Sequence, residues 1–172
     1  MPEQSNLKTV ILQPLDSVLL PATTEPFVVR DHFKKPKDVK FSTVWNEFKK
    51  RFFEKIENPR GETTYRKYKL LKITADGPII AELGGASKVE GTISAVFALL
   101  QRQGNGGPGF LQTNGYANIF YVRDMKDALC AVRTGWTEDG WVIDAISVED
   151  PLAWNGKHEI FCPVSSTDIL TG

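Results

Sequence analysis

Residues with the chemistry of a nucleophile or a proton shuttle are scarce in this sequence. The two histidines, His32 and His158, stand far apart and have no neighbouring Cys or His at metal-ligand spacing. Cys130 could act as a nucleophile only if the strands that carry Cys130 and His158 lay side by side. The sequence therefore predicts no catalytic residue, no metal and no cofactor, and it leaves open whether the protein is an enzyme.

Carboxylates near the C-terminal end offer a second chemical possibility. Asp144, Glu149 and Asp150 could supply ligands to Mg²⁺, because hard cations prefer oxygen. However, Asp144 alternates with the apolar residues of a predicted strand, and a four-residue turn before that strand places it opposite Arg133. This register favours a structural ion pair over a metal ligand or a catalytic acid.

Residues 104–109 include four glycines, and glycine-rich loops can cradle phosphates. The Lys and the hydroxyl of a nucleotide-binding P-loop are missing after them. A predicted helix also ends at Gly104, whereas an anion site would need a helix that begins there. The segment is therefore predicted to be a flexible connection.

Positive charge is concentrated in the first half of a chain that has no net charge. Residues 1–75 hold fifteen Lys or Arg against nine Asp or Glu, and residues 76–172 hold six against twelve. Residues 30–72 alone hold fourteen against six, interleaved with aromatic residues. Basic side chains neutralise phosphates and aromatic rings stack on bases, so this segment predicts a basic face. The residues predicted to form this face are Lys34, Lys35, Lys37, Lys49, Lys50, Arg51, Arg66, Lys67 and Lys69.

The favoured interpretation is a non-enzymatic binding or accessory module that contacts a polyanion, with nucleic acid considered first. No signature of a DNA- or RNA-binding family is present, and the acidic half of the chain could instead neutralise the basic face within the fold. The main alternative is a protein–protein interaction module that uses an N-terminal arm or a sheet edge. The partners considered are thus nucleic acid and protein, with no membrane.

The elements that would position these residues centre on residues 116–148. Three strands are predicted there, Ala117–Arg123, Ala128–Thr134 and Trp141–Val148, because β-branched and aromatic residues recur between Asp- and Gly-rich turns. Their consecutive order predicts an antiparallel meander, with Trp136 opposite Trp141 across the second turn.

Two helices are predicted to cover this sheet, which gives an α+β fold. The first spans residues 41–57, with Trp45, Phe48, Phe52 and Ile56 as its buried stripe. The second begins at a capping box formed by Ser87 and Glu90 and ends at Gly104. Its buried stripe is predicted to be Val89, Ile93, Val96, Phe97 and Leu100. Residues 62–74 are predicted to be an edge strand, since both faces carry charge, and residues 79–83 a short strand.

A helix followed by a meander with a Trp136-x-x-x-Gly140-Trp141 turn is similar in shape to the curved-sheet cone of the nuclear-transport-factor/ketosteroid-isomerase class. No catalytic residue of that class can be located, so the resemblance implies a shape alone. It leads to a further alternative, a small enzyme with a cone-like pocket between sheet and helices. Asp144 and Tyr121 would be the polar groups of that pocket.

The chain is predicted to comprise an extended arm (1–25), one α+β domain (26–164) and a flexible tail (165–172). No stretch is apolar enough to cross a bilayer, and the first residues lack the basic start of a signal peptide. Cys130 and Cys162 fit buried thiols of a reducing compartment better than a disulfide. These features predict a cytoplasmic protein.

Overall fold

The structure of the protein, a computed structural model, describes residues 10–164. Its strands are β1 (Leu12–Leu20), β2 (Phe27–Val28), β3 (Phe41–Val44), β4 (Ile56–Glu57), β5 (Thr63–Leu70), β6 (Thr74–Ala75), β7 (Glu90–Gly91), β8 (Asn118–Arg123), β9 (Leu129–Thr137), β10 (Gly140–Ser147), β11 (Ala153–Trp154) and β12 (Glu159–Val164). Its helices are α1 (Val29–Lys34), α2 (Asn46–Phe52), α3 (Asp76–Glu82), α4 (Ala86–Val89) and α5 (Ile93–Arg102).

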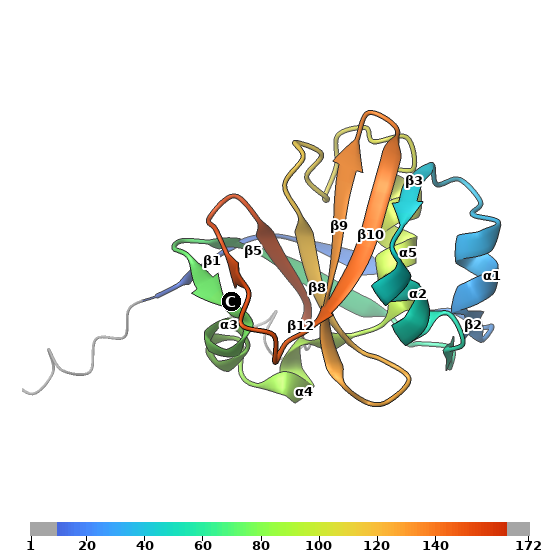
Figure 1. Cartoon of the computed structure of the whole chain (residues 1–172). Helices are drawn as coiled ribbons and strands as arrows, with labels where there is room; N and C mark the ends of the chain where they lie inside the picture. Colours follow the sequence, from blue (N-terminus) through green and yellow to red (C-terminus); the bar gives the residue numbers. More distant parts are fainter. Residues whose placement is uncertain (1–9, 165–172) are drawn as a thin grey trace, which may run out of the picture.

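Most strands belong to one sheet in the order β1-β5-β12-β8-β9-β10-β3 (Figure 1). The short strand β7 also pairs with β8. The predicted meander is confirmed as β8, β9 and β10. Two segments distant in sequence extend it: β12 lies antiparallel to β5 and parallel to β8, and β3 lies parallel to β10. The sheet therefore has eight strands in mixed orientation. The prediction of an antiparallel meander packed against two helices covers only part of this sheet.

Helices cover both faces of this sheet. On one face, α1, α2 and α5 bury Phe33, Phe48 and Phe97 in a common apolar core. On the other face, α3 and α4 bury Ile79 and Val89 beside residues of β8, β9 and β12. The second core is smaller and leaves the part of β9 and β10 nearest their connecting turn without a helix over it (Figure 1).

The predicted helix over residues 41–57 is wrong at both ends, because β3, α2 and β4 follow one another there. Phe48 and Phe52 are buried as predicted, whereas Trp45 and Ile56 are 53% and 65% exposed. Apolar residues at spacings of three and four fit one long helix, but they also fit a strand followed by a short helix. Pairing of β3 with β10 decides between the two in favour of the strand.

The predicted second helix is interrupted. The capping box of Ser87 and Glu90 does not form, because β7 pairs with β8 and extends the chain between α4 and α5. Thr92 instead caps α5, its hydroxyl accepting from the backbone N–H of Ala95 at 3.1 Å. The predicted stripe is nevertheless buried throughout, at Val89, Ile93, Val96, Phe97 and Leu100.

Two strand predictions before α4 are also corrected. Residues 79–83 lie in α3 and its C-terminal turn, and β5 lies between β1 and β12 instead of at an edge. Tyr65 and Tyr68 of β5 are buried in the two opposite cores, which explains aromatic side chains on both faces. Among the charged residues of this interior strand, Lys67 pairs with Glu159 of β12 at 3.5 Å.

The predicted N-terminal arm falls partly within the described residues. Its β1 is an edge strand paired along β5, with Leu12 and Leu20 buried. Residues 1–9 and the predicted tail, 165–172, lie outside the described residues, and the division into arm, domain and tail stays a prediction. Within residues 10–164, no helix is long and apolar enough to span a membrane.

Candidate functional site

Five of the nine predicted basic residues are lysines that lie on adjacent segments. The helices α1 and α2 are in contact, with the rings of Phe33 and Phe48 5.0 Å apart. The predicted lysines of α2, of the end of α1 and of the loop after α1 are all exposed to solvent. We term this group the lysine surface; it consists of Lys34, Lys35, Lys37, Lys49 and Lys50.

The lysine surface is poorly neutralised by neighbouring acids. Within residues 10–164 its one ion pair joins Lys50 to Glu47 at 3.2 Å. Glu54, which follows α2, pairs with Arg30 of α1 and not with a lysine of this surface. Residues 29–57 as a whole hold nine Lys or Arg against five Asp or Glu. The region therefore keeps an excess of positive charge.

The predicted basic residues of β5 lie elsewhere. Arg66, Lys67 and Lys69 are separated from β10, on which α2 packs, by the strands β12, β8 and β9. Four strand spacings correspond to about 19 Å. Lys67 is also engaged, since it donates to the carbonyl of Phe110 at 2.9 Å and pairs with Glu159. The structure does not bring this group together with the lysine surface.

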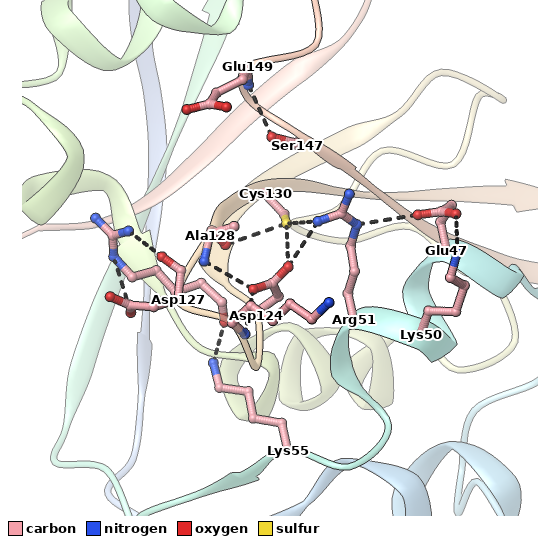
Figure 2. Close-up of polar contacts among 12 residues, drawn as sticks. Glu47, Lys50, Arg51, Lys55, Asp124, Asp127, Ala128, Cys130, Ser147 and Glu149 are labelled. Atoms are coloured by element: carbon pink, nitrogen blue, oxygen red, sulfur yellow. Dashed lines mark hydrogen bonds and ion pairs between the residues drawn. The ribbon is translucent and has the colours of Figure 1, made fainter.

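Arg51 is fixed in a polar cluster between α2 and the turn after β8 (Figure 2). Its guanidinium lies 2.9 Å from the carboxylate of Asp124 and 3.4 Å from that of Glu47. The other oxygen of Asp124 accepts from the N–H groups of Lys126 and Ala128. Burial alone would raise the pKa of Asp124, but these N–H groups and Arg51 together lower it. Arg51 thus holds the turn in place.

Cys130 belongs to the same cluster and is not paired with a histidine. Its thiol lies 3.7 Å from an oxygen of Asp124 (Figure 2), whereas His158 is at the other face of the sheet. Burial raises the pKa of Cys130 to about 11, so the group stays a thiol at neutral pH. Cys162 lies in the opposite core, which explains why the two cysteines form no disulfide.

Asp144 and Arg133 pair as the sequence predicts. They are opposite one another in β10 and β9, as are Trp141 and Trp136, and their side chains are 2.8 Å apart. An unpaired Asp144 on a pocket floor would favour the enzyme alternative, and the observed pair favours a structural role. Both residues line a groove of about 490 Å³ on the open part of the second sheet face.

His158 lies at one end of this groove. Its Nδ1 accepts from the backbone N–H of Ala117 at 2.9 Å, so the proton of the neutral ring is on Nε2. Burial, and then the positive charge of Arg133, lower the pKa of His158. The side chain is therefore a neutral hydrogen-bond donor at physiological pH.

Trp45, which the sequence predicts to be buried, lines the opposite end of the groove. It follows β3 and precedes α2, and its N–H donates to the carbonyl of Ile143 at 3.0 Å. One feature of the sequence could have indicated this position: Trp45 directly follows Val44, and consecutive side chains of an extended segment point to opposite faces of a sheet. If Val44 packs inward from a strand, the next side chain points to the other face.

Other chemical possibilities have structural explanations. Residues 10–164 contain no cluster of His, Cys, Asp or Glu that could hold a metal. The hydroxyl of Tyr121 is buried and donates to Asp76 at 2.7 Å, away from the groove. The glycine-rich loop is anchored by Gln103, whose side chain bonds to backbone groups of Gly107 and Leu111. It is an ordered connection.

Comparison of this chain with family models, with curated proteins and with solved structures finds no match.

Proposed function

We propose that the protein is a non-enzymatic binding module that contacts a polyanion, with single-stranded nucleic acid as the first ligand to test. The observation that carries this proposal is the lysine surface, five exposed lysines on adjacent segments with one ion pair among them in the described residues. When a polyanion binds such a surface, the lysines neutralise its charges and release its counterions. This release makes binding favourable at low salt.

The single-stranded form is favoured by Trp45. This side chain is 53% exposed at the start of α2, and its carbonyl accepts from the N–H of Lys49, one helical turn later. Exposed aromatic rings beside basic residues stack on bases that duplexes keep inside. A strand could therefore offer phosphates to the lysines and a base to the tryptophan.

A binding role also accords with the state of the reactive groups. Asp144 is paired with Arg133, the carboxylate of Asp124 is saturated with donors, and Cys130 stays protonated. A cytoplasmic location is part of the proposal. It is supported by Cys130 and Cys162, which are both buried without a disulfide.

The test is a titration of labelled single-stranded and duplex DNA and RNA by fluorescence anisotropy at several salt concentrations. We expect the single strands to bind more tightly, with a log–log salt slope of about −0.7 per neutralised phosphate. Lys37→Glu combined with Lys49→Glu should weaken binding and flatten this slope, since neither lysine has an ion pair in the described residues.

The matched control reverses two exposed lysines at and beyond the end of β5, Lys69→Glu with Lys72→Glu. The change in net charge is the same, but the positions are remote from the lysine surface. Equal effects of the two double variants would show that net charge alone matters. Failure of the wild type to bind any nucleic acid at about 100 µM in low salt would refute the proposal.

A second candidate function, protein recognition through a sheet edge, is favoured by one observation. The edge strand β1 exposes Leu15 and Leu19, and an added strand could pair with it between Leu12 and Leu19, whose backbone groups already bond to Glu82 and Arg102. Deletion of the arm is a poor test, because Leu12 and Leu20 of β1 are buried. Leu15→Lys with Leu19→Lys should abolish capture of such a partner and leave the unfolding free energy within about 0.5 kcal/mol.

A further inference from the structure

We propose that the groove between Trp45 and His158 holds one unstacked nucleobase, with guanine the best match. The inference rests on the proposed function, because it assigns a base site to the strand that the lysine surface would bind. Three features of the groove lead to it: an open floor, an aromatic rim and a set of neighbouring donors and acceptors.

The floor is open because of Gly135. A methyl group built on this glycine would meet Val142 at 3.7 Å, an ordinary contact, so packing does not require glycine here. Glycine in a strand interior weakens the strand and often marks a place where another molecule approaches closely. The absence of a side chain between Arg133 and the end of β9 leaves room above Val142 in a groove of about 490 Å³.

The rim is formed by Trp45. A tryptophan that is 53% exposed leaves a large apolar surface in water, and here that surface borders the groove. An unstacked base on this ring would cover apolar area on both partners. Stacking of this kind is the usual way in which proteins hold bases of single strands.

The polar groups match the adjoining Hoogsteen and Watson–Crick edges of a guanine. Arg133 is 38% exposed, and a guanidinium has five N–H groups, of which one bonds to Asp144. The Nε2–H of His158 has no partner within residues 10–164. Arg133 and His158 can donate to O6 and N7 of guanine, and Asp144 can accept from its ring and exocyclic N–H groups. Adenine, cytosine and uracil each offer fewer of these bonds.

The groove and the lysine surface meet on α2. Lys49 lies one helical turn after Trp45, with its N–H bonded to the tryptophan carbonyl at 3.1 Å. A strand that leaves its base in the groove would therefore pass its phosphates toward Lys49. Base and phosphate contacts use different residues, so they can be tested separately.

Three probes separate the two contacts: guanosine, which has a base and no phosphate; inorganic polyphosphate, which has no base; and a short thymine strand with one central guanine. Gly135→Val should fill the groove floor and suit a strand, and thermal denaturation checks that its stability is kept. Trp45→Ala removes the rim and changes an exposed residue, so it serves as the second groove variant.

We expect guanosine, followed by NMR shifts, to bind the wild type and the Lys37→Glu, Lys49→Glu variant alike. Either groove variant should lose that binding and weaken the thymine strand about tenfold or more, while polyphosphate binding stays unchanged. Adenosine, cytidine and uridine should bind more weakly than guanosine. Guanosine that fails to bind, or that binds Gly135→Val as well as the wild type, would overturn the inference.

Failure of the two proposals would look different. If polyphosphate and the strand bind and neither groove variant changes the strand affinity, the lysine surface stands and the base site does not. If guanosine binds in a manner that depends on Gly135 and Trp45 while polyphosphate does not bind, the base site stands and the polyanion surface falls.

Discussion

Arg133 and Asp144 face each other across β9 and β10, with Nη2 of the arginine 2.8 Å from Oδ2 of the aspartate. The same guanidinium lies 5.6 Å from the ring of Trp154, which is buried in the second core. Asp144 is in turn held by the N–H of Ala145 at 2.8 Å. The pair thus joins the wall of the groove to the core beneath α3 and α4.

This geometry predicts a measurable coupling between the two side chains. We expect Arg133→Ala and Asp144→Ala each to lower the unfolding free energy by about 1 kcal/mol, with a coupling energy of about 0.5–1 kcal/mol in a double-mutant cycle by urea denaturation. The exposed pair of Lys50 and Glu47 serves as the control and should couple by about 0.3 kcal/mol. Additive single effects at Arg133 and Asp144 would contradict the prediction.

The register of this pair was predictable because it depends on local information. Alternation along two consecutive strands and the length of one turn place Arg133 opposite Asp144 and Trp136 opposite Trp141. The spacing of apolar residues in α5 is equally local, and its buried stripe follows from the sequence.

The groove was not predictable, because its ends come from pairings distant in sequence. His158 reaches it because β12 enters the sheet beside β8, and no local pattern states which strands will be neighbours. Trp45 reaches it because β3 pairs with β10, whereas its spacing from Phe48 and Phe52 fits a buried helical stripe. The sequence predicts one face for the basic residues of β5 and of α2 for the same reason, since closeness in sequence is the one guide to closeness in space.

Glu57 provides a second stability prediction. Its buried carboxylate accepts from the N–H groups of Ile93 and Ser94, both at 2.8 Å, at the start of α5. These are two of the N–H groups that a helix leaves unpaired, so Glu57→Ala should cost about 1–3 kcal/mol of unfolding free energy. The control is Glu54→Ala, which removes an exposed ion pair and should change stability by about 0.5 kcal/mol or less. Equal losses would show that the cap contributes nothing.

Asp124 gives a prediction for acid. The pKa of this carboxyl is lowered in the folded protein, so its contribution is present above the unfolded pKa of about 3.9 and is lost as pH falls through the folded pKa. Asp124→Asn keeps an oxygen for the turn N–H groups but removes the charge that faces Arg51. We expect it to be less stable by about 1–2 kcal/mol at pH 7, and the difference should shrink in acid.

The control for this variant is Asp127→Asn, which changes a carboxylate of the same turn that is 88% exposed. Chemical denaturation from about pH 7 to about pH 3 would follow both variants across the unfolded pKa. A loss in Asp124→Asn that persists undiminished at the lowest pH would assign its role to shape instead of charge.

Asp76 should respond to pH in the opposite direction. It is almost fully buried, and one oxygen accepts from both Tyr121 and Trp154 at 2.7 Å. Its second oxygen is buried without a hydrogen-bond partner in the described residues. Burial therefore raises the pKa of Asp76 although both donors oppose the shift. The folded state then holds the proton more tightly than the unfolded state does.

By linkage, an acid with a raised folded pKa lowers the unfolding free energy as pH rises from the unfolded pKa, about 3.9, through the folded pKa. Asp76→Asn keeps an oxygen for Tyr121 and Trp154 and cannot ionise, so it should gain stability relative to the wild type over that range. Urea denaturation of both proteins at several pH values measures this gain, and the exposed Asp150→Asn controls for the loss of one negative charge. If the unfolding free energy of the wild type instead rises relative to that of Asp76→Asn as pH increases, the buried group is stabilised as the carboxylate.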